Sequence, residues 1–357
     1  MRAPGHHRAA VATTAVLALA ALTLTACSSG GSSTSAAGST TPTTSATSSA
    51  SPSPSPTPSD FVGIPEGASP FSGRPGGAGK KVLVVKFDNT PNAQPHSGLR
   101  SADIVYIEEV EFGLSRIAAV FSSELPKTVG PVRSARISDI DLLAQFGRPA
   151  FAYSGAQHKM RPVLARASIY DVSGDRGPSG YFRDPRRKAP YNFMGVPARL
   201  LARAPKASTA QDVGFVFSQT VPAGGRAVKV AIAPYPASQA KFVWNAKAKS
   251  FDVWLNKKPA RATEGGTQHA TTVVIQYVAQ RDSGFGDKFG GKTPLLQTVG
   301  TGKAWVLRDG RAYSVTWTRS SATSGTTFTT ADGNPLPFAA GQIWIALVNA
   351  KSKATIA

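Results

Sequence analysis

A single cysteine, Cys27, occurs in the 357-residue chain, so no disulfide bond can stabilise its fold. Cysteine-based metal sites and thiol catalysis are excluded as well once that one thiol is modified. A folded region must therefore rely on its apolar core, which 41% hydrophobic residues can supply in one large or two medium-sized domains.

Cys27 stands at the end of the string LTAC (residues 24–27), after Arg2, Arg8 and an apolar run over residues 11–24. This layout is typical of a bacterial secretory signal, and a cysteine at the cleavage point is what a lipobox requires. The alternatives are an ordinary signal with an incidental cysteine and a membrane-spanning helix, which needs about 20 apolar residues. We expect residues 1–27 to be a lipoprotein signal and Cys27 to carry a lipid. The protein would then be anchored on the extracytoplasmic face of the cell membrane, in an envelope of the Gram-positive type.

The chain is strongly basic, with 40 basic and 20 acidic residues and a net charge of +20. Without residues 1–27 it would keep 38 basic residues and a net charge of +18. Such a surface attracts polyanions, which outside a cell membrane are anionic lipid head groups, acidic glycans or anionic wall polymers. We expect neither nucleic acid nor nucleotide as a partner in that compartment. The alternative is that the charge is a general property of an exported protein.

Residues 28–59 contain no charged side chain and consist of Ser, Thr, Gly, Ala and Pro, ending in Ser-Pro repeats. Such a composition cannot bury enough apolar surface to fold, so we predict a disordered tether over residues 28–79. Folded character is expected from Lys81 onward.

Two regions with different patterns follow the tether. Strands are predicted at residues 82–85, 103–110, 114–121 and 151–153, and helices at residues 137–146, 157–167 and 197–204. From residue 227 onward nearly every segment is predicted to be a strand, and Asp309-Gly310 indicates a hairpin. The sequence thus predicts an α+β protein with a mixed N-terminal α/β domain (residues 80–219) and a mainly antiparallel β-rich C-terminal domain (residues 226–357).

The familiar catalytic patterns are weak. Residues 286–293 match the phosphate-loop string, but Pro294 follows at once and Gly300 would end any helix within two turns, so we interpret the segment as a glycine-rich loop between strands. Outside the signal the histidines are His96, His158 and His269, which are isolated in sequence. We expect no metal site and no cofactor, and interpret each histidine as buried with its partner or as a surface residue.

Polar residues cluster instead between Asp88 and Asn192. The string GPVRSAR (residues 130–136) places Arg133, Ser134 and Arg136 at the expected start of a helix. There the two guanidinium groups and the free N–H groups of the helix would face the same side. That arrangement is a candidate cradle for phosphate or carboxylate, because arginine binds both groups in bidentate fashion.

A second basic segment covers residues 181–192, where loop-like composition favours a binding edge. Its candidate ligand-binding residues are Tyr181, Arg183, Arg187, Lys188, Tyr191 and Asn192. Four acids near strand ends are candidates for acid–base catalysis, namely Asp88, Glu108, Glu111 and Asp184. The alternative for all of these residues is structural, as arginine–carboxylate pairs that hold loops to a sheet.

The same strings resemble the YerB-like family of bacterial lipoproteins, over nearly all of the expected folded region. The matching segments are residues 86–89, 95–99, 102–106, Glu111, Arg116, residues 130–136, 153–155, 182–184, 187–192, Trp317, residues 332–333 and 341–345. The resemblance implies an α+β layered sandwich with N- and C-terminal parts and adds Arg116 to the candidate ligand-binding residues. It implies no reaction, because the family's domain is of unknown function. Tyr191 stands where a histidine is common and Tyr181 where a tryptophan is.

Three functional hypotheses remain open. The first is a membrane-anchored lipoprotein that binds an anionic or carbohydrate envelope ligand through an arginine-rich cleft. The second is a hydrolase or transferase acting on such a polymer, which requires two carboxylates about 5–10 Å apart in one pocket. The third is a scaffold for envelope enzymes, in which the arginines would form internal ion pairs.

Overall fold

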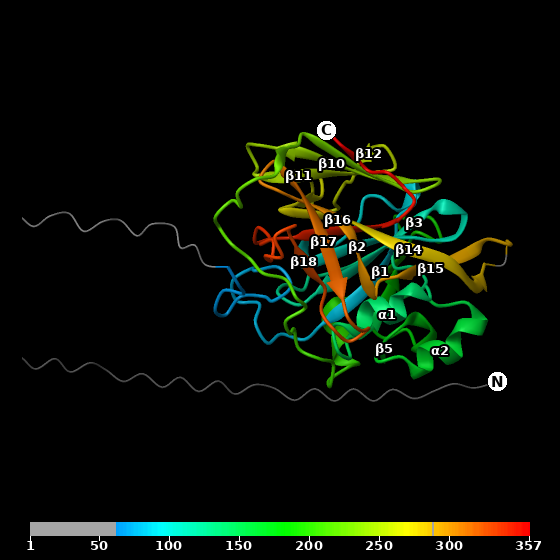
Figure 1. Cartoon of the computed structure of the whole chain (residues 1–357). Coiled ribbons are helices and arrows are strands. Elements are labelled where there is room, and N and C mark those ends of the chain that lie inside the picture. Colours follow the sequence, from blue (N-terminus) through cyan, green and yellow to red (C-terminus); the bar gives the residue numbers. More distant parts are fainter. Residues whose placement is uncertain (1–61, 288) are drawn as a thin grey trace, which may run out of the picture. The chain divides into compact units, whose positions relative to one another are not determined.

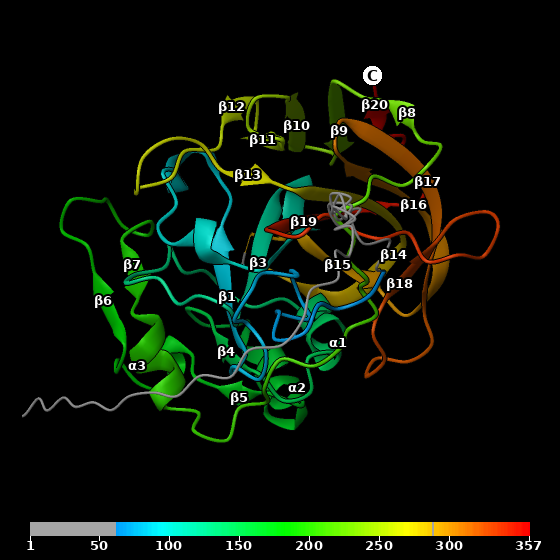
Figure 2. The same cartoon turned by 90° about the vertical axis from the view of Figure 1, so that its left-hand side faces the viewer.

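The computed structural model describes residues 62–287 and 289–357, which Figures 1 and 2 show from two directions. The expected signal, Cys27 and the tether up to residue 61 lie outside the described residues. The described residues belong to one compact unit. None of the helices in them is long and apolar enough to cross a membrane.

The described part contains few helices and many strands. Its α-helices are α1 (Ser138–Ala144), α2 (Arg161–Arg166) and α3 (Pro197–Ala202). The strands of the first half are β1 (Leu83–Asp88), β2 (Ile104–Glu109), β3 (Ser115–Phe121), β4 (Ala150–Ala152), β5 (Tyr170–Asp171), β6 (Tyr181–Arg183) and β7 (Phe193–Gly195). The strands of the second half are β8 (Arg226–Ala227), β9 (Val230–Pro234), β10 (Gln239–Asn245), β11 (Ser250–Leu255), β12 (Lys258–Pro259), β13 (His269–Ala270), β14 (Thr272–Gly286), β15 (Lys292–Gln297), β16 (Gly300–Arg308), β17 (Arg311–Arg319), β18 (Thr327–Thr329), β19 (Ile343–Asn349) and β20 (Thr355–Ile356).

A twelve-stranded mixed sheet runs through the centre of the unit, in the order β18-β17-β16-β14-β19-β2-β3-β1-β4-β5, with β15 beside β14 and β8 beside β17. Strand β19 lies between β14 and β2 and is parallel to both. Strand β2 comes from the first half of the chain, so the two predicted domains share one hydrogen-bonded sheet. The domain boundary near residues 219–226 was predicted from a change in sequence pattern and stays a prediction. In the structure this boundary does not separate two sheets.

A second sheet of six strands, β12-β11-β10-β9-β20 with β13 beside β11, covers one face of the central sheet. Its strands alternate between buried and partly exposed positions, as expected for a sheet with one face on the core. Ala231, Phe242 and Val253 point inward and share one apolar core with residues of the central sheet. Phe242 meets Trp344 of β19 edge to face at 6.4 Å.

The opposite face of the central sheet is covered by the short helices and by irregular segments. Leu142 and Leu143 of α1 share a second apolar core with Val84, Tyr106 and other residues of that face. The predicted helices all exist but are shorter than expected, because α2 begins only after a single 3-10 turn and α3 ends at Ala202. The N-terminal part is therefore β-rich rather than an even α/β mixture.

Residues 62–79 correct the expected extent of the tether. Gly63 bridges to Phe217, and Phe71 is fully buried 5.2 Å from the ring of Phe146. The hydroxyl of Ser72 donates to the buried carboxylate of Asp103 at 2.5 Å. The tether prediction was therefore wrong for residues 62–79, because one aromatic side chain and a few serines complete a core formed by distant strands.

Candidate functional site

Three neighbouring strands place charged side chains on one face of the central sheet. Asp88, the last residue of β1, lies directly opposite Arg116 of β3, and Arg116 lies opposite Glu108 of β2. Directly opposite residues in a sheet share a face. This is the face that carries α1. Val84 lies four positions before Asp88 in β1, and Tyr106 lies two positions before Glu108 in β2, so they share a face with these acids. Both belong to the same core as Leu142 of α1.

The GPVRSAR string (residues 130–136) is extended and not helical, which corrects the expected cradle. Helix α1 begins only at Ser138. The amide of Arg133 donates to the carbonyl of Lys86 at 2.8 Å, and that of Arg136 donates to Asp139 at 2.6 Å. These N–H groups are therefore not free to bind an anion, and the two arginine side chains reach different carboxylates.

Arg133 pairs with Asp88, with 2.7 Å between Nε and Oδ2. The carboxylate is 1% exposed, and its other oxygen accepts hydrogen bonds from the amide and the hydroxyl of Thr90. Burial alone would raise the pKa of Asp88. The hydrogen bonds from Thr90 and the charges of Arg116 and Arg133 outweigh burial and lower that pKa. Asp88 is therefore a permanent anion at neutral pH.

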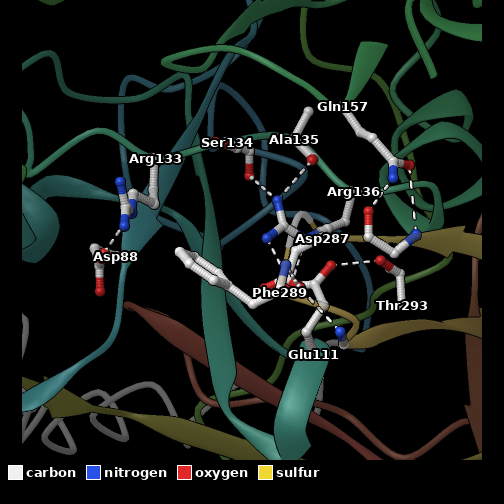
Figure 3. A network of polar contacts seen from close by, with 12 residues as sticks. Asp88, Glu111, Arg133, Ser134, Ala135, Arg136, Gln157, Asp287, Phe289 and Thr293 are labelled. Carbon is white, nitrogen blue, oxygen red and sulfur yellow. Dashed lines mark hydrogen bonds and ion pairs between the residues drawn. The ribbon is translucent and has the colours of Figure 1, made fainter. Parts of the chain in front are cut away.

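Arg136 donates two hydrogen bonds to Oε2 of Glu111, from Nε at 3.0 Å and from Nη2 at 2.6 Å (Figure 3). The hydroxyl of Thr293 donates to the other carboxylate oxygen. Burial would raise the pKa of Glu111, but Arg136 and Thr293 together lower it. Nη1 of Arg136 also donates to the carbonyl of Ala135, so all three nitrogens of its guanidinium have hydrogen-bond partners within the protein.

Arg116 lies among these pairs without a carboxylate of its own. No ion pair involving Arg116 is found in the described part of the chain, and its buried Nη1 has no hydrogen-bond partner there. Burial and the charge of Arg136 lower the pKa of Arg116 to about 9, which leaves it charged at neutral pH. The residue as a whole keeps partial exposure to solvent. We call Asp88, Glu111, Arg116, Arg133 and Arg136 the arginine cluster; it holds three cations and two anions.

A second charged group lies deeper on the same face. The ammonium of Lys86 contacts Glu108 at 3.0 Å and Asp139 at 2.8 Å, and all three side chains are fully buried. Burial and the nearby Asp139 raise the pKa of Glu108 to about 7. We expected Glu108 as a candidate acid or base; it is sealed from solvent, so a substrate cannot reach it.

The second basic segment forms a separate cavity of about 750 Å³, which we call the Arg187 pocket. Its lining residues are Pro91, Asn92, Gln94, Pro95, Asp184, Arg186, Arg187, Lys188, Tyr191 and Thr263. Arg187 donates to the carbonyls of Pro95 at 2.6 Å and Ala93 at 3.3 Å, which fixes it in the wall. Lys188 is exposed, with no ion pair in the described residues.

Asp184 is held as an anion at the edge of this pocket. Both Nε and Nη2 of Arg186 donate to it at 2.9 Å, and this contact lowers the pKa of Asp184 to about 2. The buried His96 connects the pocket wall to the arginine cluster, since its Nε2 lies 2.7 Å from the carbonyl oxygen of Asp88. Burial lowers the pKa of His96, so the ring is neutral and Nε2–H donates.

Four further candidates have partners inside the protein. Tyr181 stacks on Phe193 at 4.8 Å, and its hydroxyl donates to the carbonyl of Val172 at 2.8 Å. One face of the Tyr181 ring is therefore already covered, and a role for Tyr181 in ligand binding stays a prediction. Arg183 donates to Asn192 at 2.8 Å, so these two residues form a pair at the protein surface. The hydroxyl of Ser134 lies 3.5 Å from that of Ser154.

The glycine-rich string at residues 286–293 begins at the end of β14 and finishes at the start of β15, so it joins the two strands of a hairpin and is not followed by a helix. Sequence reasoning missed that this hairpin reaches the arginine cluster. Thr293 binds Glu111 across 182 positions of the chain, and Gln157 donates to the carbonyl of Gly286. The exposed Phe289 sits at the tip (Figure 3). No local pattern in the sequence links these residues.

The described residues contain no group of three His, Asp or Glu side chains arranged to hold a metal ion. The arginine cluster holds one more cation than anion, and an excess positive charge of this kind can attract an oxyanion. Because Arg116 keeps partial exposure to solvent, a carboxylate or phosphate beside it could balance its charge, and arginine is well suited to both groups.

Two family descriptions match the chain: the N-terminal domain of "Protein of unknown function (DUF3048)" over residues 71–210, and its C-terminal domain over residues 230–345. The "Putative lipoprotein YerB" of Bacillus subtilis (strain 168) is 33% identical over 113 residues. That stretch covers 32% of this chain and 34% of the relative, so it spans about a third of the relative's length. The crystal structure of the YerB protein from Bacillus subtilis is similar in fold, with a TM-score of 0.70 at 22% identity, and the match covers 81% of this chain and 99% of that one.

Proposed function

The chain belongs to the DUF3048, or YerB-like, family, and we propose that it is a membrane-anchored extracytoplasmic lipoprotein that binds an anionic group of a cell-envelope polymer at the arginine cluster. The anchor would be a lipid on Cys27. Two observations support it, the LTAC string after a basic and apolar signal and the printed name of the Bacillus subtilis relative.

The binding proposal depends on one observation, the positive charge of the partly exposed Arg116, which has no ion-pair partner and an unpaired Nη1 among the described residues. An unsatisfied buried donor on a charged group is costly, and most such groups in proteins are paired. Arg133 and Arg136 are committed to Asp88 and Glu111, so their charges are largely balanced. The third cation has no such balance, and an incoming carboxylate or phosphate would provide it.

The Arg187 pocket supports a polymeric ligand. Its lining includes the exposed cations Arg186 and Lys188, the aromatic Tyr191 and one anion, Asp184. Such a cavity suits a second anionic or sugar unit of the same chain, with Tyr191 as a stacking surface. His96 follows Pro95 of the pocket wall and donates to the carbonyl oxygen of Asp88, so one buried hydrogen bond links the two sites.

The hydrolase alternative has less support from the four candidate acids. Asp88, Glu111 and Asp184 are each paired with an arginine that lowers their pKa or keeps it low, and a general acid needs the opposite. Glu108 has a raised pKa but no access to solvent. The scaffold alternative would leave the arginine cluster as an internal ion-pair network.

Binding to purified cell walls, with and without their anionic polymers, tests the proposal. The variant Arg116→Gln keeps the length of the side chain and removes its charge. We expect a 10- to 100-fold loss of affinity for walls that carry anionic polymer, roughly the strength of a charge-assisted hydrogen bond. Arg199→Gln, on the exposed surface of α3, is the matched control and should bind like the parent.

Thermal unfolding of both variants separates a folding defect from a binding defect. Equal binding by Arg116→Gln and the parent would contradict the proposal and favour the scaffold. Release of shortened polymer chains, measured by mass spectrometry, would favour the hydrolase.

A further inference from the structure

The outer face of the six-stranded sheet has an apolar centre. Ile232 of β9, Lys241 of β10 and Trp254 of β11 stand side by side in one row, and Val230, Val243 and Asp252 form the next. These positions are partly exposed, whereas Ala231, Phe242 and Val253 beside them along the strands are buried in the core. The ammonium of Lys241 lies 3.8 Å from the centroid of the Trp254 ring.

Lysines surround this centre. Lys247 and Lys249 lie in the turn between β10 and β11, and Lys257 and Lys258 lie where β11 turns into β12. Lys229 precedes β9, and Lys351 and Lys353 precede β20. All seven are exposed, and none makes an ion pair with the residues that the structure describes.

The local charge is correspondingly high. Residues 226–259 and 350–357 together contain nine basic residues and a single acid, Asp252. This is a net charge of +8 out of +20 for the whole chain. We call this surface, with Ile232, Val243 and Trp254 at its centre and the lysines around it, the lysine face.

We propose that the lysine face docks on an anionic membrane surface. Its cations are ammonium groups on long flexible stems, dispersed over several turns, which suits a diffuse layer of head groups better than one fixed oxyanion. Tryptophan and lysine are also the side chains that settle at the boundary between head groups and acyl chains.

The length of the chain before the described part points to the same occupant. Residues 28–61 separate Cys27 from Val62, and 34 residues can span at most about 115 Å. If Cys27 is lipidated, as the proposed function holds, the face is never far from the membrane. Docking is then an intramolecular event, so weak attraction by several lysines is enough.

Docking in this way would orient the arginine cluster. The six-stranded sheet covers one face of the central sheet, and Asp88 and Arg116 project from the opposite face with the core that contains α1. Figure 1 shows β10, β11 and β12 on one side of the unit and α1 and α2 on the other. A membrane under the lysine face would leave the arginine cluster directed toward the envelope polymers.

Vesicle co-sedimentation tests the docking without the lipid anchor. The probe is the chain from residue 27 onward with Cys27→Ser, mixed with vesicles of 30% phosphatidylglycerol in phosphatidylcholine or of phosphatidylcholine alone. We expect binding to the anionic vesicles only, decreasing with salt. Since Cys27→Ser carries no lipid, a failure of the anchor proposal does not affect this result.

A charge-matched pair of variants locates the binding surface. Replacing Lys247, Lys249, Lys257 and Lys258 by alanine should weaken vesicle binding more than a hundred-fold, at about five-fold per lysine. Replacing Lys127, Lys159, Lys206 and Lys303 removes the same charge from exposed positions elsewhere and should reduce binding far less. An equal loss in both variants would overturn the proposal.

The partner class is tested with the same proteins. Brominated phosphatidylglycerol should quench tryptophan emission on docking, and Trp254→Phe should remove most of that quenching. If the four lysine substitutions abolish binding to a soluble poly(glycerol phosphate) but leave vesicle binding unchanged, the face serves a polymer and the membrane proposal is wrong.

Discussion

At the scale of single residues, the protein buries charge on one face of its central sheet. Lys86, Glu108 and Asp139 are fully buried, with one cation between two carboxylates. Two ionised acids against one lysine would leave an unbalanced charge in a medium of low polarity, so the site favours one extra proton. The raised pKa of Glu108 expresses this preference.

This proton makes stability depend on pH. The pKa of Glu108 rises from 4.5 to about 7 on folding, so its contribution is fully present below pH 4.5 and is lost as the pH rises through 7. In Glu108→Gln that contribution is absent. The difference in unfolding free energy between parent and variant should therefore change by on the order of 3 kcal/mol from pH 4 to pH 8, to the disadvantage of the parent.

Urea unfolding at several pH values measures this difference. The exposed Glu66→Gln serves as the matched control, since a surface substitution changes stability by about 0.5 kcal/mol or less. A difference between parent and Glu108→Gln that stays constant from pH 4 to pH 8 would contradict the assignment of the proton to this group.

At the scale of elements, short irregular segments complete the core that the strands begin. Residues 62–79 contain no helix or strand of their own, yet Phe71 packs on Phe146 and bonds from Ser69 and Ser72 satisfy Asp103. The hairpin of β14 and β15 closes over Glu111 in a comparable way through Thr293. The local sequence of neither segment predicts these contacts.

Phe71→Ala tests the role of the first of these segments. Removal of a fully buried phenylalanine ring leaves a cavity, and we expect a loss of about 3–5 kcal/mol in unfolding free energy. Val62→Ala, at an exposed position of the same segment, should cost less than about 0.5 kcal/mol. If both variants unfold at the same urea concentration as the parent, residues 62–79 are not part of the cooperative unit.

At the scale of the whole molecule, β19 ties the two halves of the chain together. It pairs with β14 over seven positions and with β2 over four, so the last long strand lies beside one of the first. The six-stranded sheet then packs on strands of both halves, since its Phe242 shares one apolar core with Val85 of β1 and Trp344 of β19. Neither half has its apolar surface covered without the other.

The two halves should therefore fold only together. We expect residues 27–219 and 226–357, produced separately, to lack cooperative unfolding in calorimetry, whereas the chain from residue 27 onward unfolds in one transition. Mixing the two fragments should restore part of the transition. Independent transitions in the separate fragments would show two autonomous domains, as the composition of the sequence had indicated.

The local features of the fold were predictable because they depend on neighbouring residues. Apolar runs on either side of Gly113 indicated β2 and β3, and Asp309-Gly310 marked the turn between β16 and β17, where both residues adopt the left-handed conformation. The resemblance of the strings around Asp88, Arg116 and Arg133 selected the residues of the arginine cluster. The structure brings these three residues together in space, which the separate strings of the sequence could not establish.

What the sequence by itself determined was the absence of disulfides, the basic charge, the order of the strands along the chain and the residues worth testing. Only the tertiary structure decided which strands pair, that Arg133 and Arg136 neutralise Asp88 and Glu111, and that Arg116 is left without a carboxylate. The physical reason is the separation along the chain of the residues that interact. Strand formation follows from side chains two positions apart, whereas each of these ion pairs joins residues 25 or more positions apart.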